Sequence, residues 1–284
     1  MHKRIVIVGL ALVVVAAVTL TARVERETRN VAAEGAQRLD IKLEFAAGEL
    51  MLASGDFDDA ARLELEYDPD KTDYIVDYEV TDRRGHLFIE SDHKRNNDID
   101  TDDNRLNLTM STRYPTRLEM DMGACDATLD LGGVPLEELN LDVGAASGDI
   151  EFTKMNPERC REINIDAGAT SLDMHMIGNA NFEEMNFSGG AGSFDLDFRG
   201  EYKGVSRVDL EIGLGSCDIT LPEGVPVRIV SKNANWLSSV DVHEGSNIRQ
   251  LDDDEWESGD FEGSDTQIIL TLEVGLGSVD IYFK

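Results

Sequence analysis

The chain has 284 residues, of which 57 are acidic and 26 basic, and its formal net charge at pH 7 is −31. Such a charge repels phosphate backbones and anionic lipid head groups, so we do not expect nucleic acid as a partner. Three cysteines without CxxC spacing (Cys125, Cys160 and Cys217) argue against a disulfide framework and a thiolate metal site, and we expect Cys125 and Cys217 to be small buried side chains.

The first expected element is an apolar segment near the N-terminus. MHKR is followed by residues 5–22, which are apolar or small, and then by the charged run RVERE. About 18 apolar residues can span a bilayer, with Lys3 and Arg4 held on the cytoplasmic side. A cleaved signal peptide prefers a shorter run and a small-x-small site, which Val15-Ala16-Ala17 matches poorly. We therefore expect residues 1–22 to be a membrane anchor that places the rest of the chain outside the cytoplasm, in the periplasm or at the cell surface. The protein would be secreted if this segment is cleaved.

The next stretch is expected to be a linker, residues 23–38, followed by β-structure over residues 39–117. LDIKLEFAAGELMLASG, which spans Leu39 to Gly55, alternates apolar and polar residues on both sides of Gly48. The strand-like runs LELEYD, YIVDYEV, HLFIES and RLNLTMS follow, separated by turn-rich segments. This pattern predicts one coil of two short strands, capped or extended by antiparallel hairpins.

Residues 118–284 repeat one phrase. GLGSCDITL, which starts at Gly213, returns as GLGSVDIYF at Gly275, and related copies precede them from Leu118, Leu139, Ile163 and Met185. A weaker copy, NWLSSVDV, lies between the last two, and the acidic insertion 251–265 separates it from the end of the chain. One serine recurs about every 23 residues, except across the insertion, at Ser147, Ser171, Ser193, Ser216, Ser239 and Ser278.

Each copy alternates apolar and polar residues around a glycine, as two short strands joined at a corner would. Close approach or a positive φ at such a corner would require glycine. The fold predicted from this pattern is all-β, a single-stack β-solenoid with about 23 residues per coil, in which equivalent positions of successive copies lie next to one another. The last copy is expected to end the stack. One inward column is expected to hold Ile150, Leu172, Leu196, Ile219 and Ile281.

The repeated GxGSxDI phrase, the short strands, the placement outside the cytoplasm and the run Leu221–Val227 resemble the bacterial toast-rack families. These include adhesin-like domains of unknown function and the C-terminal domain of LiaF-like regulators of envelope stress. The resemblance covers most of the chain from Leu39 and is tightest from Leu118 onward. It implies a β-solenoid-like fold with no cofactor and no recognised catalytic residue. LiaF-like proteins carry several membrane helices before this domain, whereas this chain has one apolar segment.

The outward position two residues after each repeated serine carries the most highly charged feature of the repeat, a column of aspartates that begins beside Thr128. Neighbouring carboxylates about 4.8 Å apart repel one another, so this column predicts either full exposure with splayed side chains and local hydrogen bonds, or capture of divalent cations between coils. We assign no metal site, and keep the cation ladder as a weaker hypothesis. Its members are Asp149, Asp173, Asp195, Asp218, Asp241 and Asp280.

The sequence favours a module without catalytic residues. Its five histidines show no metal-ligand spacing and no plausible nucleophile partner, so we assign no catalytic and no cofactor-binding residue. The alternative is a carbohydrate-active β-helix enzyme, a polysaccharide hydrolase or lyase that uses the acidic face. Trp236 and Trp256, near the insertion, are candidate partner contacts or cap residues. We therefore expect a membrane-anchored envelope module that binds, scaffolds or regulates through a protein partner.

Overall fold

The computed structural model describes residues 24–94, 104–232, 238–243, 247–259 and 261–284. Within these ranges the chain forms β-strands and one short 3₁₀ turn, Ile177–Ala180, so the expected all-β class is confirmed. No helix in these ranges is long and apolar enough to cross a membrane, and the expected anchor, residues 5–22, lies outside the described residues. The strands are β1 (Glu25–Ala32), β2 (Arg38–Gly55), β3 (Asp59–Tyr67), β4 (Thr72–Thr81), β5 (Arg84–His93), β6 (Arg105–Ser111), β7 (Thr116–Asp130), β8 (Leu136–Val143), β9 (Ser147–Glu151), β10 (Cys160–His175), β11 (Phe182–Asp197), β12 (Val205–Leu221), β13 (Val227–Ser231), β14 (Ser238–Val242), β15 (Ile248–Asp252), β16 (Glu255–Ser258) and β17 (Gln267–Phe283).

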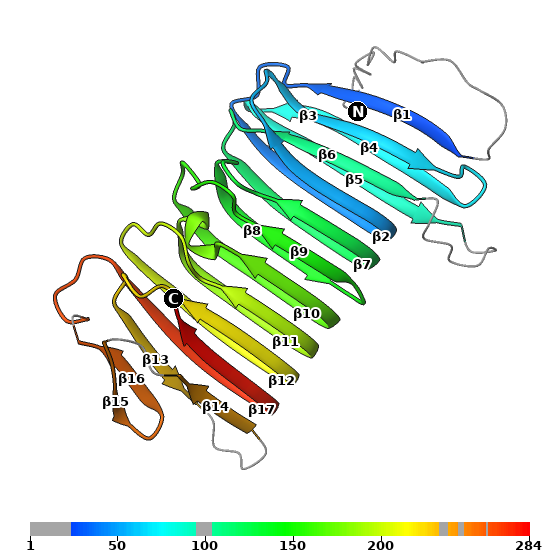
Figure 1. The fold of residues 1–284 in the computed structure, drawn as a ribbon. Coiled ribbons are helices and arrows are strands. Elements are labelled where there is room, and N and C mark those ends of the chain that lie inside the picture. The colour runs from blue at the N-terminus through cyan, green and yellow to red at the C-terminus, as the bar shows by residue number, and fades with distance from the viewer. Residues whose placement is uncertain (1–23, 95–103, 233–237, 244–246, 260) are drawn as a thin grey trace, which may run out of the picture.

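The repeated copies lie side by side as parallel strands, in the register that the repeat predicts (Figure 1). Ile163 of β10 pairs with Met185 of β11, and Met185 pairs with Val208 of β12. After the corner, Ser171 pairs with Ser193, and Ser193 with Ser216. Equivalent residues of successive copies therefore are neighbours along the whole length of each strand, as expected.

Most copies are one long bent strand rather than the two short strands expected. β7, β10, β11, β12 and β17 each run through the corner without a break, whereas the copy formed by β8 and β9 is interrupted there. In β10 the consecutive residues Gly168 and Ala169 are both exposed, so the inward-outward alternation changes phase at the bend. This change lets the apolar residues on both sides of the corner face the same core.

Glycines line the corner for two different reasons. A Cβ at Gly168 would lie 2.7 Å from the carbonyl oxygen of Gly144, and one at Gly190 would lie 2.7 Å from that of Gly168. Two residues later along the strand, Gly277 has a φ of 149°, and its Cβ would lie 1.8 Å from the carbonyl oxygen of Gly215. Glycine is therefore required in the first column because the stacked backbones approach closely. In the second column the positive φ is a further reason for glycine.

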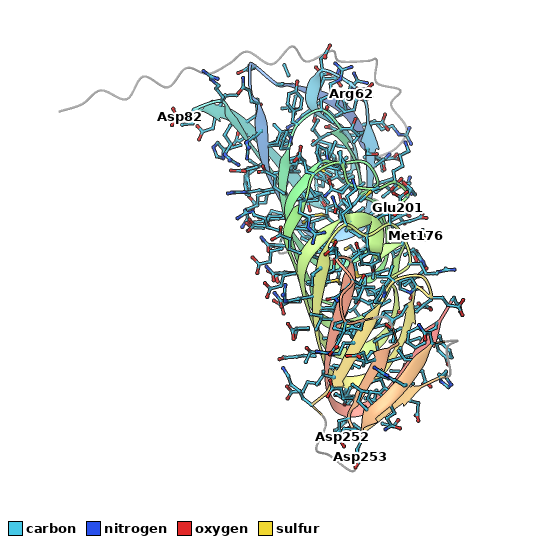
Figure 2. All side chains as sticks on the ribbon, turned by 90° about the vertical axis from the view of Figure 1, so that its left-hand side faces the viewer. Arg62, Asp82, Met176, Glu201, Asp252 and Asp253 are labelled. Carbon is cyan, nitrogen blue, oxygen red and sulfur yellow. The ribbon has the colours of Figure 1, made fainter. Side chains whose placement is uncertain are left out.

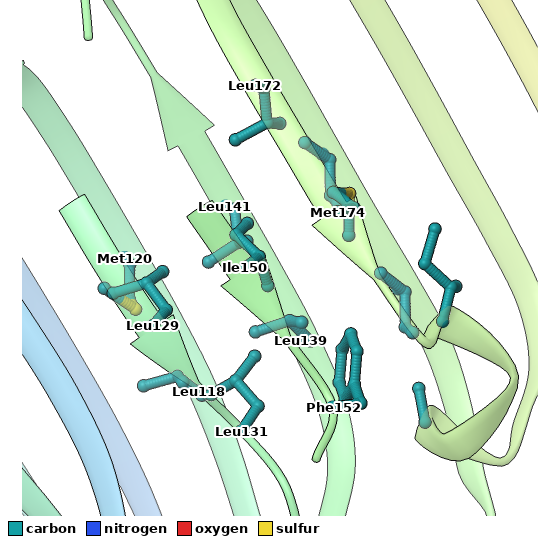
Figure 3. Close-up of a cluster of buried hydrophobic side chains, with 14 of the residues drawn as sticks. Leu118, Met120, Leu129, Leu131, Leu139, Leu141, Ile150, Phe152, Leu172 and Met174 are labelled. Atoms are coloured by element: carbon teal, nitrogen blue, oxygen red, sulfur yellow. The ribbon is translucent and has the colours of Figure 1, made fainter. Parts of the chain in front are cut away.

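The core lies between the inner faces of the bent strands and the segments that return the chain to the next copy. Leu141, Ile150, Leu172 and Met174 are buried there, with Phe152 from a return segment (Figure 3). The expected inward column needs one correction. Ile150 pairs with Met174, which pairs with Leu196, whereas Leu172 pairs with Phe194. Leu172 is buried on the same face, but two residues earlier along its strand.

The expectation that the last copy ends the stack is wrong. β17 pairs with β12 through 16 residue pairs on one side, and with β13 and β14 on the other. The short strands β13 and β14, the latter being the weak copy, therefore form the outermost coil, and the last copy is inserted inside it. A full-length strand between two neighbours buries both of its halves. A short strand at the edge leaves less backbone and side-chain surface unpaired than a long strand would.

The N-terminal end of the stack is arranged in the same manner. β2 lies between β7 on one side and the two strands β5 and β6 on the other, all parallel to it. β4 then pairs antiparallel with β5, and β3 with β6, so the expected hairpins do extend the first coil. Residues 23–38 are not a linker: β1 pairs antiparallel with β3 and covers its edge.

Candidate functional site

The outward aspartate column forms in the predicted register along the second half of the coils. Thr128 pairs with Asp149, and the column continues from strand to strand to Asp280 of β17 and Asp241 of β14. At its end the Nε2 atom of His243 lies 2.8 Å from a carboxylate oxygen of Asp280, and the ring of His243 is stacked on Tyr282. The structure thus brings the predicted carboxylates together as a surface ladder.

Nothing in the described ranges turns this ladder into a metal centre. No group of three or more His, Cys, Asp or Glu side chains there is placed to hold a metal ion. Side chains one strand apart meet in pairs along a straight column, whereas a divalent cation needs several oxygen ligands that converge on one point. The aspartate column is therefore an extended negative surface.

A second acidic column, which sequence reasoning missed, runs along the first half of the coils. Glu44 of β2 pairs with Glu90 of β5 and with Asp121 of β7, and the column continues through Asp142 and Asp166. Asp121, Asp142 and Asp166 occupy the position two before the first corner glycine, in DMG, DVG and DAG. The same repeat alignment that predicts the aspartate column therefore contains the signal for this one.

This second column borders a shallow groove of about 760 Å³ at the corner, floored by the backbone of the glycine column. Burial, hydrogen bonding with the Asp121 carboxyl, and the charges of Asp121, Asp166 and Glu119 raise the pKa of Asp142 above its usual range. Like charges on adjacent strands therefore make the groove strongly negative. Its lining includes Glu44, Glu90, Asp92, Asp121, Asp142 and Asp166.

One lysine reaches the edge of this acidic column. The Nζ atom of Lys42 lies 2.7 Å from a carboxylate oxygen of Glu119, 3.3 Å from Glu44 and 3.5 Å from Asp121. Hydrogen bonds with Glu119 and Glu44 raise the pKa of Lys42, which therefore stays charged. Further along, the Asn140, Asn164 and Asn186 amides form a hydrogen-bonded ladder, with 2.9 Å between successive side chains. The outer face of the first half thus combines a negative groove with a neutral amide ladder.

The first part of the acidic insertion lies in the β15–β16 hairpin at the C-terminal end of the stack. β16 pairs antiparallel with β13, which places Trp256 opposite Ile229 and partly buries it against the core. Glu257 has a side chain only 4% exposed and forms ion pairs with Arg228 and Arg249. Trp256 therefore packs as part of a cap, while Trp236, the other candidate contact, lies outside the described residues.

The three cysteines are free and buried, as expected for Cys125 and Cys217. Burial raises the pKa of Cys125 to about 11 and that of Cys160 to about 12, and also raises that of Cys217. Because the thiolate is the nucleophilic form, these side chains are unreactive at neutral pH.

Comparison with known proteins gives one family. The family model described as "N-terminal domain of toast_rack, DUF2154" matches residues 20–175, which is 156 of the 284 residues. No curated protein matches the chain. A "putative cell adhesion protein" of Clostridium sporogenes is 20% identical, with a TM-score of 0.47 over 92% of this chain and 100% of that one. A "putative adhesin" of Bacteroides fragilis is 12% identical, with a TM-score of 0.45 over 93% and 100%.

Proposed function

The chain belongs to the toast-rack family, and from that premise we propose that it is a non-catalytic binding module of the bacterial cell envelope. In this proposal residues 5–22 hold it at the membrane and the strands lie outside the cytoplasm. We further infer that the stack is a β-solenoid, since the parallel copies from β7 to β12 follow one another in register at the period of the sequence repeat.

The regular outer surface is the observation that supports this function most. The aspartate column passes over β9, β10, β11, β12, β17 and β14, so the same side chain recurs at about the strand spacing of 4.8 Å. A repeated, extended face suits contact with a long partner. A catalytic site instead requires groups with different, matched roles that converge on one reacting bond.

The charge on this surface indicates the class of partner. With a formal net charge of −31, the module repels anionic polymers and attracts basic protein surfaces. We therefore propose a protein of the envelope as partner, bound in a scaffolding or stress-regulatory role.

Protease treatment of spheroplasts tests the placement. We expect external protease to digest a C-terminal tag on the full chain, and the tag to stay with the membrane fraction before digestion. A tag that is fully protected in intact spheroplasts and digested after lysis would place the strands in the cytoplasm and overturn the proposal.

Glycan turnover tests the non-catalytic part. Purified full chain is incubated with polyuronates and other envelope glycans, beside Asp173→Asn and Asp195→Asn. We expect no products from any of the three proteins. Turnover by the wild type that either substitution abolishes would instead identify a carbohydrate-active enzyme that uses the acidic face.

A further inference from the structure

The stack has two ends, and at each end the first half and the second half of the coil must be covered. These four places differ in how they are closed. At the N-terminal end, β4 covers the first half of the coil with the aromatic side chains of Tyr74 and Tyr78, and β3 and β1 cover the second half. At the C-terminal end, the β15–β16 hairpin covers the first half with Trp256. In each of these three places an antiparallel strand closes the parallel stack. Figure 2 shows Asp252 and Asp253 of the hairpin at the opposite end of the molecule from Arg62 and Asp82.

The fourth place is the second half of the coil at the C-terminal end. Its outermost strand is β14, which is parallel to its neighbour β17. Val240 pairs with Val279 of β17 and Val242 pairs with Ile281. Val279 and Ile281 are fully buried, whereas Val240 and Val242 pack against the core but stay partly exposed. The two inward columns that run through the stack therefore stop at an incompletely covered pair of valines.

The backbone of these valines faces outward along the sheet. The N–H of His243 donates to the carbonyl oxygen of Ile281 at 2.9 Å. In a parallel ladder alternate residues bond to the same neighbour, so Asp241 also faces β17, and the N–H and C=O groups of Val240 and Val242 point away from it. Among the described residues no strand pairs with Val240 or Val242 on that side. This edge can accept another strand.

The charge at this edge determines which strand fits. Asp241 is exposed and is the last member of the aspartate column, next to Asp280, which His243 contacts. A second copy of the chain would bring a further net charge of −31 and would be repelled. A strand with a lysine or arginine opposite Asp241 would instead gain a cross-strand ion pair.

We propose that the outer edge of β14 binds an extended basic peptide segment of an envelope partner by strand addition. Alternate apolar residues of the peptide continue the columns of Val240 and Val242, and a basic residue lies opposite Asp241. This inference rests on the proposed binding function and names its contact edge and the chemistry of its partner.

The test uses the full chain in detergent micelles and a fluorescein-labelled peptide of alternating valine and lysine. Fluorescence anisotropy measures the affinity. We expect saturable binding that Val240→Pro weakens at least tenfold, because proline removes an N–H that faces the peptide and leaves the hydrogen bonds to β17 intact. An alternating valine–glutamate peptide should not bind.

Charge is tested with a matched pair of substitutions in one column. Asp241→Lys should weaken binding at least fivefold, whereas Asp173→Lys, which makes the same change in the middle of the stack, should change it less than twofold. Equal losses for the two variants would show that the peptide responds to overall charge, and would overturn the proposal.

Three further results would overturn it. They are no binding by the wild type, equal binding by wild type and Val240→Pro, and a wild-type dimer that Val240→Pro dissociates, which would make a second copy the occupant. If Val240→Pro lowers the melting temperature, a peptide N-methylated at alternate residues blocks strand addition without altering the protein, and it should fail to bind. The peptide-binding experiments and the spheroplast experiment are independent. A failure to bind peptide would therefore overturn the binding edge on β14 without changing the result on the placement of the strands.

Discussion

At the residue scale, neighbouring side chains on one strand lie in opposite environments. Leu172 is 1% exposed and packs in the core, while Asp173, the next residue, lies in the outward aspartate column. A carboxylate at position 172 would be buried without a partner. We expect Leu172→Asp to destabilise the fold by more than about 4 kcal/mol, which is enough to unfold many domains. Asp173→Asn should change stability by less than about 0.5 kcal/mol. Thermal melts monitored by circular dichroism decide this, and similar small shifts for both variants would contradict the inward and outward assignment.

A second prediction at the residue scale concerns Asp142, whose substitution should stabilise the protein rather than destabilise it. Its pKa is raised by burial and by the neighbouring carboxyl of Asp121, so the folded state binds its proton more tightly than the unfolded state does. That group contributes stability at low pH, and the contribution is lost as pH rises through the raised pKa. Asp142→Asn should therefore raise the melting temperature at pH 7, because it removes a negative charge that the neighbouring carboxylates repel.

The pH dependence of this effect serves as its control. As pH falls through the raised pKa the wild-type carboxyl becomes protonated, so the difference in melting temperature between wild type and Asp142→Asn should shrink. A variant that is less stable than wild type at pH 7 would show that the charged form of Asp142 makes a needed contact.

At the element scale, the β15–β16 hairpin is attached to β13 by strand pairing and by ion pairs to one buried carboxylate, that of Glu257. The Nε atom of Arg228 donates to Glu257 at 3.0 Å, and Arg249 donates to the other carboxylate oxygen at 3.2 Å. Arg228 also lies over the ring of Phe261, 4.4 Å from its centroid, and the hydroxyl of Ser258 accepts the N–H of Val227. These contacts attach the hairpin as a cap, which keeps the edge of β13 from pairing with other chains.

Glu257→Gln tests this attachment. The hydrogen bonds from Arg228 and Arg249 hold the pKa of Glu257 below its usual range, so its stabilisation is present at neutral pH and is lost as pH falls through that lowered pKa. We expect the substitution to cost about 2 kcal/mol at pH 7 and to open the hairpin locally. Hydrogen exchange of the β15–β16 amides at pH 7 measures the opening. Unchanged protection there, or a loss spread evenly over the stack, would contradict the hairpin's dependence on Glu257.

At the scale of the whole molecule, both ends of the stack are closed by an out-and-back path of the chain. The chain leaves β2, forms the outer strands β3 to β6, and returns to place β7 against β2. It leaves β12, forms β13 to β16, and returns to place β17 against β12. The outermost strands therefore depend on strands that lie far from them in the sequence.

Removal of β17 tests this dependence. A chain that stops before Gln267 loses the strand between β12 and the outer pair β13 and β14, so both sides of the gap expose buried side chains. We expect it to aggregate on expression, whereas deletion of residues 247–259, which removes only the outer hairpin, should leave β1 to β12 folded. Size-exclusion chromatography and circular dichroism compare the two. A soluble, cooperatively melting chain without β17 would contradict the inserted position of that strand.

The sequence determined the all-β class, the register of the copies and the outward aspartate column, because a residue such as Asp173 meets the same neighbours in every repeat. It also contained the second acidic column, at the position of Asp142, although that position was not recognised as a column. Local alternation and a constant period are properties of the chain itself, and no long-range information is needed to obtain them.

Only the tertiary structure decided the order of the coils at the two ends. Nothing in the phrase GLGSVDIYF says that β17 enters between β12 and the weaker copy, since every copy can in principle pair with every other. The order of the strands depends on how much surface each one buries. A long strand such as β17 buries most when it lies between two neighbours, and the short β14 leaves least surface exposed when it lies at the edge. The same competition placed β1 against β3 in a segment that looked like a linker, because an open strand edge pairs with whatever chain lies within reach.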